Sequence, residues 1–106
     1  MSLYQLVLTV SLTCLLSACG ASDRAVAISE LSGDAEAGAP LYSENCSRCH
    51  GATAQGGSGP NLVSYIKDHD EAEVIDVILE GSGGMPSFNS LGDQQIADII
   101  AHIKSL

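Results

Sequence analysis

The clearest chemistry in this chain of 106 residues lies in the run Cys46-Ser47-Arg48-Cys49-His50. Two cysteines three positions apart, followed at once by a histidine, form the pattern that attaches a c-type haem. Residues three apart share one face of a helical turn, so both sulfurs can reach the vinyl groups along one edge of a porphyrin and form thioethers. The sequence therefore predicts one covalent haem c, bound at Cys46 and Cys49.

His50 is the expected iron ligand on one side of that haem. Its imidazole follows the second cysteine directly and can turn beneath the iron. A neutral imidazole offers one nitrogen to the metal, while the other donates to an acceptor that fixes the tautomer and the ring orientation. We therefore expect a hydrogen-bond acceptor beside the second nitrogen of His50.

Two other uses of a C-x-x-C pair are open. A redox dithiol would need a βαβ context, and a zinc site would need further ligands. The sequence indicates neither, and an apparent export signal precedes the pair. A structural lipoprotein that binds zinc remains the alternative, and it predicts a chain without haem.

Residues 1–18 have the character of a signal peptide, which would direct the chain to the bacterial periplasm. Leu3 to Leu16 is largely apolar, but this stretch is too short to cross a bilayer core of roughly 30 Å. Its length is typical of the apolar core of a secretory signal. The absence of Lys or Arg before the apolar run departs from the usual pattern.

The apolar run ends with Leu-Ser-Ala-Cys at residues 16–19, which resembles a bacterial lipoprotein cleavage box. Cys14 fits such a box less well, because Thr13 precedes it. We therefore expect Cys19 to be lipidated and to anchor the protein to a membrane. With Cys46 and Cys49 on haem, no thiol would be left for a disulfide.

Residues 19–33 are expected to form the lipidated N-terminus and a flexible tether. From Gly20 to Gly33 the sequence is rich in Gly, Ala and Ser and shows no clear hydrophobic period. Such a linker has an r.m.s. span on the order of 20 Å. An anchored domain could then swing between partners near the membrane.

Residues 34–106 are expected to form one small all-α domain, with no strand and no second domain. Asp34 is a candidate cap for a helix that runs toward Cys49, in which Pro40 should cause a kink or a later start. A domain of this size has a marginal apolar core. A large apolar cofactor at its centre would supply the missing interior.

Two more helices follow from hydrophobic spacing. Asp70 and Glu73 form a capping-box-like start for one of them, and Gly81 should end it. Residues 61–67 are expected to form a short helix. The apolar stripes comprise Val74, Ile75, Ile78 and Leu79 in the first helix, and Ile96, Ile99, Ile100 and Ile103 in the last.

Taken together and in order, these features resemble class I monohaem cytochrome c, in particular the short bacterial forms related to cytochromes c5, c6 and c551. The resemblance implies a small cytochrome c fold over residues 34–106, with three to four helices wrapped around one covalently bound haem. The matching segments are Gly33-Asp34, Gly38, Tyr42, Asn45 to Gly51, Gly59 to Leu62, Gly84-Met85-Pro86 and Ile100 to Ile103.

The resemblance implies two further site residues. Met85 matches the distal ligand, whose thioether sulfur binds iron opposite His50 and raises the reduction potential. Met85 is also the only methionine outside the predicted signal, and it lies in a Gly-rich loop beside Pro86. Pro60 matches the residue whose carbonyl accepts a hydrogen bond from the iron-binding histidine.

Other positions are expected to support this site. Gly38 and Tyr42 match first-helix residues that pack against the last helix, and Tyr65 and Phe88 are candidates for the haem pocket. His102 departs from the family pattern, which has Tyr or Trp there. It is expected to pack as a flat aromatic substitute, with titration at an interface as the alternative.

The resemblance implies an electron carrier rather than an enzyme: a periplasmic monomer that shuttles single electrons between a donor and an acceptor, such as a dehydrogenase, oxidase or reductase. The net charge of −9 and the four basic residues exclude nucleic acid as a partner. An acidic surface would steer the domain toward basic docking sites. The alternative, a haem-based gas sensor or peroxidase-like enzyme, would need an open distal iron site.

Overall fold

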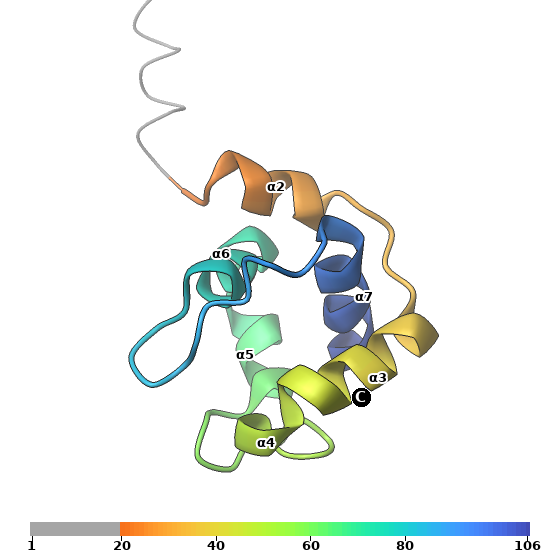
Figure 1. Cartoon of the computed structure of the whole chain (residues 1–106), viewed down its shortest axis with the longest axis vertical. Coiled ribbons are helices and arrows are strands. Elements are labelled where there is room, and N and C mark those ends of the chain that lie inside the picture. Colours follow the sequence, from red (N-terminus) through yellow and green to blue (C-terminus); the bar gives the residue numbers. More distant parts are fainter. Residues whose placement is uncertain (1–19) are drawn as a thin grey trace, which may run out of the picture.

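The computed structural model describes residues 20–106, so the proposed signal peptide and Cys19 lie outside the described residues. This part of the chain is all-helical, as predicted, and its only β pairing is an isolated bridge between Ser82 and Met85 (Figure 1). None of its helices is long and apolar enough to cross a membrane. The helices are α2 (Asp23–Ser29), α3 (Ala35–Asn45), α4 (Ser47–His50), α5 (Leu62–Asp68), α6 (Glu71–Glu80) and α7 (Asp93–Lys104).

The crossing of α3 and α7 is the most extensive helix contact of the fold. Asp34 caps α3, because its carboxylate accepts hydrogen bonds from the backbone N–H groups of Glu36 and Ala37 at 2.9 and 3.3 Å. Gly38 lies at the crossing, where an added Cβ would lie 1.9 Å from the carbonyl oxygen of Asp98. Glycine therefore allows the two backbones to approach closely.

Pro40 lies inside α3 without delaying it, contrary to one of the two expected effects. The helix begins at Ala35, directly after its cap, and continues past Pro40 to Asn45. Proline lacks the N–H that would bond to the carbonyl of Glu36. Both Pro40 and Glu36 are exposed, so water can hydrate the carbonyl that is left without this bond.

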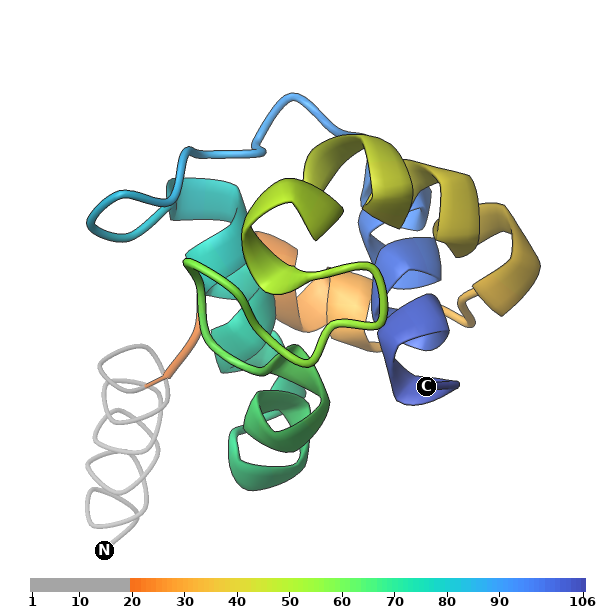
Figure 2. The same ribbon diagram turned by 90° about the horizontal axis from the view of Figure 1, so that it is seen from below.

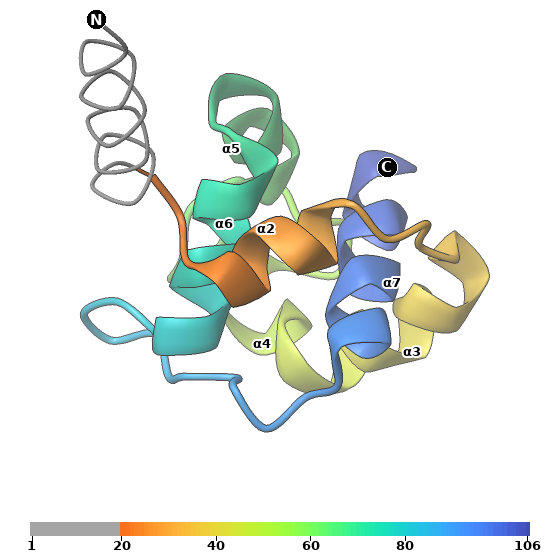
Figure 3. The ribbon, with the colours of Figure 1, turned by 90° about the horizontal axis from the view of Figure 1, so that it is seen from above.

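The flexible tether predicted for residues 19–33 is wrong for residues 23–29, which form α2. Figure 3 shows α2 lying across α6 and α7 rather than extending away from the domain. Its inward side chains, Ala25 and Ile28, are 0% and 1% exposed. A helix of two turns with one alanine and one isoleucine facing inward has too few apolar positions to show a period in the sequence.

The N-terminal end of α2 is fixed by hydrogen bonds to α6. The Ser22 hydroxyl caps α2 by accepting from the N–H of Ala25, and it donates to Asp76 Oδ1 at 2.6 Å. The backbone N–H of Ser22 donates to Asp76 Oδ2 at 2.8 Å. The segment that was expected to be free is therefore attached to the domain at its first turn.

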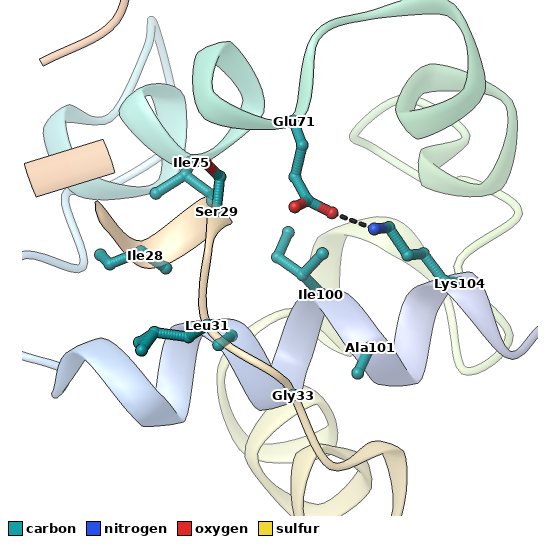
Figure 4. Close-up of a pocket in the computed structure, with 10 residues that line it drawn as sticks. Ile28, Ser29, Leu31, Gly33, Glu71, Ile75, Ile100, Ala101 and Lys104 are labelled. Carbon is teal, nitrogen blue, oxygen red and sulfur yellow. Dashed lines mark ion pairs between the residues drawn. The ribbon is translucent and has the colours of Figure 1, made fainter. Parts of the chain in front are cut away.

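A cavity of about 160 Å³ lies between α2, α6 and α7 (Figure 4). Ile28 and Ile75 are part of its apolar wall. Glu71 of α6 and Lys104 of α7 form an ion pair at its edge. This pair joins the start of α6 to the end of α7.

α5 and α6 confirm the expected helices and differ in how they begin. The side chain of Asn61 caps α5 by accepting from the N–H of Ser64 at 3.1 Å. Asp70 stands at the N-cap of α6, but its side chain makes no cap hydrogen bond, so the capping-box contact is absent. α6 ends at Gly81, whose φ of 79° is accessible to glycine.

The predicted apolar stripe of α7 is confirmed and is shared by two buried clusters. Ile96 and Ile100 pack with residues of α2 and α6, while Ile99 and Ile103 pack with Tyr42 of α3 and with the loop after α4. All four isoleucines are at most 3% exposed. α7 therefore packs against α2 and α6 on one side and against α3 on the other. α4, which carries the C-x-x-C-H run, follows α3 in the chain.

Candidate functional site

A cleft of about 870 Å³ lies between α4 and the loop that joins α6 to α7. This loop, residues 81–92, is called the methionine loop below; it lies across from α4 in Figure 2. The volume is in the upper part of the range of roughly 300 to 1,000 Å³ that is usual for ligand sites. The cleft brings together all five residues that the sequence analysis assigned to the site, namely Cys46, Cys49, His50, Pro60 and Met85.

α4 presents the two cysteines and the histidine to this cleft. Cys46 is the N-cap residue of α4 and is partly buried, whereas Cys49 is exposed, and neither is in a disulfide. Burial raises the pKa of the Cys46 thiol to about 11, so the free thiol is protonated at neutral pH. A thioether at this position would likewise be uncharged, which suits a partly buried wall.

His50 is held in one orientation by the loop that follows α4. Its ring is buried, and Nδ1 lies 3.0 Å from the carbonyl oxygen of Pro60. Because a carbonyl can only accept, Nδ1 carries the proton and Nε2 is left with a lone pair for a metal. The contact that the resemblance implied between Pro60 and His50 is therefore present.

Residues 51–61 fold back over α4 through backbone hydrogen bonds. The N–H of Gly56 donates to the carbonyl of His50, and the N–H of Gly59 donates to the carbonyl of Cys49, both at 2.8 Å. A Cβ on Gly59 would lie 2.7 Å from Cε1 of His50. The lack of a side chain at Gly59 thus leaves room for the imidazole, a role that the sequence analysis did not assign.

Gly59→Ala is expected to displace the imidazole of His50 and to weaken its hydrogen bond to Pro60, because the added Cβ would overlap the ring. The oxidised holoprotein should contain a smaller low-spin fraction in its absorption and EPR spectra. Gly92→Ala is the matched control, since an added Cβ there would make only ordinary contacts, the nearest at 3.5 Å, and Gly92 does not line the cleft. Identical spectra for Gly59→Ala and the unmodified protein would contradict this role.

The methionine loop carries Met85 on a tight backbone turn. The N–H of Met85 donates to the carbonyl of Ser82 at 2.9 Å, and the N–H of Ser82 donates back to Met85 at 3.1 Å. Further along the loop, the N–H of Phe88 donates to the carbonyl of Ile78 in α6 at 2.9 Å. Met85 is partly buried and lines the cleft, so its thioether can contact a group that binds there.

Apolar and aromatic side chains complete the wall. Tyr65 and Phe88, the two candidates for the pocket, both line the cleft, and α6 adds Val77, which the sequence analysis did not assign to the site. Val77 lies between the core positions of α6 in the sequence, and only the folded chain shows that it lines the cleft. The wall suits a large apolar group.

Tyr42 and His102 pack behind the site, as expected for an aromatic pair. Their ring centroids are 5.3 Å apart with an interplanar angle of 49°. The Tyr42 hydroxyl donates to the carbonyl of Gly51 at 2.6 Å. Burial is the main cause that raises the pKa of Tyr42, so the hydroxyl stays protonated and acts as a donor. His102 therefore serves as the packing partner that Tyr or Trp supplies in the family pattern.

The residues of the cleft fit a covalently bound haem. Two thiols follow one another at helical spacing, a buried imidazole has one nitrogen free, and a thioether lies on a separate loop. Within residues 20–106, no cluster of three or more His, Cys, Asp and Glu side chains is arranged to hold a metal ion. The zinc alternative therefore has no further ligands in the described part of the chain.

Comparison with known proteins places the chain among haem proteins. Residues 33–103 match the family described as "Cytochrome C oxidase, cbb3-type, subunit III". Cytochrome c-551 of Bacillus subtilis (strain 168) is 35% identical over 100 residues, which cover 91% of this chain and 88% of that protein. The cbb3-type cytochrome c oxidase subunit FixP of Bradyrhizobium sp. (strain ORS 278) is 36% identical over 80 residues, 69% of this chain and 28% of that subunit.

Among solved structures, cytochrome cL from Methylophaga aminisulfidivorans MPT superposes with a TM-score of 0.59 at 31% identity. The match covers 67% of this chain and 53% of that one, so this chain spans about half of that structure. The family match over residues 33–103 includes α3 to α6 and nearly all of α7, so the similarity is not confined to the C-x-x-C-H run. The chain therefore belongs to the class I monohaem cytochromes c, electron carriers that bind one haem c covalently.

Proposed function

We propose that the haem is attached through thioethers to Cys46 and Cys49 and that its iron is held by His50 and Met85. The observation that carries this proposal is the cleft, which gathers the four side chains from α4 and the methionine loop. The haem supplies the one-electron chemistry, and the protein supplies ligands, orientation and burial.

Each side chain has a physical task in this arrangement. His50 offers Nε2 because Pro60 holds the proton on Nδ1. Met85 offers a soft thioether sulfur, which favours reduced iron over oxidised iron. Val77 and Phe88 give their side of the cleft an apolar surface, and an apolar surface beside the haem would disfavour the more highly charged oxidised state. The thioether of Met85 and the apolar wall raise the reduction potential. The hydrogen bond to Pro60 keeps the imidazole of His50 in one orientation, which favours fast electron transfer.

The oxidised absorption spectrum separates this proposal from an open-site sensor or peroxidase-like enzyme. A sulfur ligand gives a charge-transfer band between methionine and ferric iron, and it leaves no position for an exogenous gas. We expect the band in the oxidised protein and no rapid CO binding to the reduced protein. High-spin iron, no band and rapid CO binding would favour the alternative.

We propose that the carrier works in the bacterial periplasm and exchanges electrons with redox proteins that present basic docking sites. The net charge is −9, and two of the four basic residues, Arg24 and Lys104, are already paired with carboxylates. Similarity to an oxidase subunit supports redox partners in general. Electron-transfer complexes with such an acidic protein should form faster at low ionic strength.

We further propose that Cys19 is lipidated and that the anchor holds the domain close to the membrane. Ser22 is already bound to Asp76 of α6. Three residue steps from Cys19 to Ser22 span at most about 11 Å. The wide swing expected from a tether over residues 19–33 is therefore replaced by a short connection to a docked helix.

Cys19→Ser is expected to release the haem protein from the membrane, because the chain would lose its acylation site. Haem-stained gels of membrane and soluble fractions measure this distribution. Cys14→Ser is the matched control and should stay in the membrane fraction. Retention of Cys19→Ser in washed membranes would show that something other than lipid at this cysteine anchors the protein.

A further inference from the structure

Arg24 of α2 reaches the far end of the methionine loop. Its Nε donates to Asp93 Oδ1 at 2.9 Å, its Nη1 to the carbonyl of Asn89 at 3.0 Å, and its Nη2 to the carbonyl of Leu91 at 2.9 Å. One guanidinium therefore joins three positions at the junction between the loop and α7, across a separation of 65 to 69 residues.

The geometry requires arginine. Five N–H donors in a planar fork can bond to a carboxylate and two carbonyls at once, which the single ammonium of lysine cannot do in the same directions. The side chains of Arg24 and Asp93 are 39% and 51% exposed, so the ion pair alone contributes little. The two backbone carbonyls are the contacts that restrain the loop.

α2 is a fixed base for this side chain. Ala25 and Ile28, which follow Arg24 in α2, are buried, and Ser22 before it is bonded to Asp76. The guanidinium is thus held by the body of the domain. If α2 were a mobile tether, the same hydrogen bonds from Arg24 would not hold the loop in place.

Hydrogen bonds attach the methionine loop to α6 close to Met85 and to α2 at its far end. Near Met85, the hydroxyl of Ser87 donates to the carbonyl of Leu79 and the N–H of Phe88 donates to the carbonyl of Ile78. At the far end, Arg24 ties residues 89–93. Of these hydrogen bonds, release of the Arg24 contacts would leave only those from Ser87 and Phe88 to hold this part of the loop to the domain. The loop could then open more often from the cleft.

We propose that Arg24 is a positioning residue that keeps the methionine loop closed and so keeps Met85 on the haem iron. This proposal rests on the ligation of iron by Met85 proposed above. α2, which the sequence indicated as part of a tether, is then a component of the redox site. Its role is exerted through backbone carbonyls of the loop and involves no contact with the haem.

Imidazole binding to the oxidised holoprotein measures the open state of the loop. Imidazole can bind iron only when Met85 is off, so its apparent dissociation constant varies inversely with the open fraction. Arg24→Gln should raise that fraction and lower the apparent dissociation constant by about tenfold. Arg24→Lys should fall between Arg24→Gln and the unmodified protein. Lys67→Gln, the matched control for charge at an exposed site of α5, should leave the value unchanged.

Met85→Ala, measured alongside, separates the two proposals. It should bind imidazole more tightly than Arg24→Gln does, and adding Arg24→Gln to it should have no further effect. If Met85→Ala leaves the affinity unchanged, ligation by Met85 is wrong. If Met85→Ala tightens binding and Arg24→Gln does not, the role of Arg24 is wrong.

Hydrogen exchange gives a second measurement that does not depend on the spectrum of the haem. The amides of Phe88 and Leu91 are hydrogen-bonded within this part of the fold. Arg24→Gln should accelerate exchange at these amides by about tenfold while amides in the middle of α7 remain protected. Equal acceleration throughout α7 would indicate global destabilisation and would overturn the proposal, as would unchanged exchange at Phe88 and Leu91.

Discussion

Met85→His is expected to lower the midpoint potential of the haem by on the order of 0.1 V or more, within the roughly 0.8 V over which axial ligands shift haem potentials. The physical reason is the change of donor atom. The thioether of Met85 favours reduced iron, whereas an imidazole nitrogen stabilises oxidised iron better. A spectroelectrochemical titration of the purified holoprotein measures the shift.

The control for this experiment comes from the same loop. Asn89 takes part in the contacts of the loop through its backbone, since its carbonyl accepts from Arg24 and its N–H donates to the hydroxyl of Ser87, so Asn89→Ala should keep the potential of the unmodified protein. The charge-transfer band should also survive in Asn89→Ala and disappear in Met85→His. A potential that is the same in all three proteins would remove Met85 from the iron.

Gly38→Ala is expected to destabilise the protein by about 3 kcal/mol, although alanine is the better helix former by roughly 1 kcal/mol. The added Cβ would lie 1.9 Å from the carbonyl oxygen of Asp98, so α3 and α7 would have to separate. A loss of this size is a large part of the 5 to 15 kcal/mol that stabilises a typical domain. The two effects have opposite signs, so the outcome decides between them.

Denaturant unfolding of the holoprotein measures the free energy of unfolding of this variant. Ala37→Gly, at the exposed neighbouring position of α3, reports helix propensity without a steric effect and should cost up to about 1 kcal/mol. A Gly38→Ala protein as stable as the unmodified one would mean that the helices can separate without cost. The close approach at Gly38 would then be unimportant for the fold.

The candidate site could be proposed from the sequence because three of its residues are encoded locally. Cys46, Cys49 and His50 lie within five consecutive residues, and helical spacing alone places them on one side of α4. The resemblance then supplied Pro60 and Met85, which the fold brings to the same cleft. Sequence spacing could not supply these two, since each reaches the cleft through a separate loop.

The helices with long apolar stripes were also predictable, whereas α2 was not. α7 buries Ile96 and Ile103 on a stripe that can be recognised without a structure. α2 buries only Ala25 and Ile28, and its position depends on hydrogen bonds such as that from Ser22 to a residue 54 positions later in the chain. Local sequence patterns do not encode contacts of that range.

The capping of α6 shows a second limit of sequence patterns. Asp70 and Glu73 have the spacing of a capping box, and α6 does begin after Asp70. Its side chain nevertheless makes no cap hydrogen bond. The start of α6 is instead joined to α7 by the ion pair of Glu71 with Lys104, a tertiary contact that spacing along one helix does not indicate.

The docked α2 also changes how an N-terminal anchor would act on the protein. Ser22 and Arg24 lie at its first turn, one bonded to α6 and the other to the methionine loop. A lipid on Cys19 would therefore be connected to the domain next to the residue that restrains the loop. The segment next to the anchor and the haem site would then belong to the same folded domain.

X-ray absorption at the iron edge of the reduced holoprotein identifies the atoms bound to the metal, and it therefore tests axial ligation by His50 and Met85 without a further assumption. With His50 and Met85 as the two axial ligands, we predict a single sulfur neighbour among nitrogen neighbours, and loss of that sulfur in Met85→His. A coordination shell without sulfur in the unmodified protein would show that Met85 does not bind the iron.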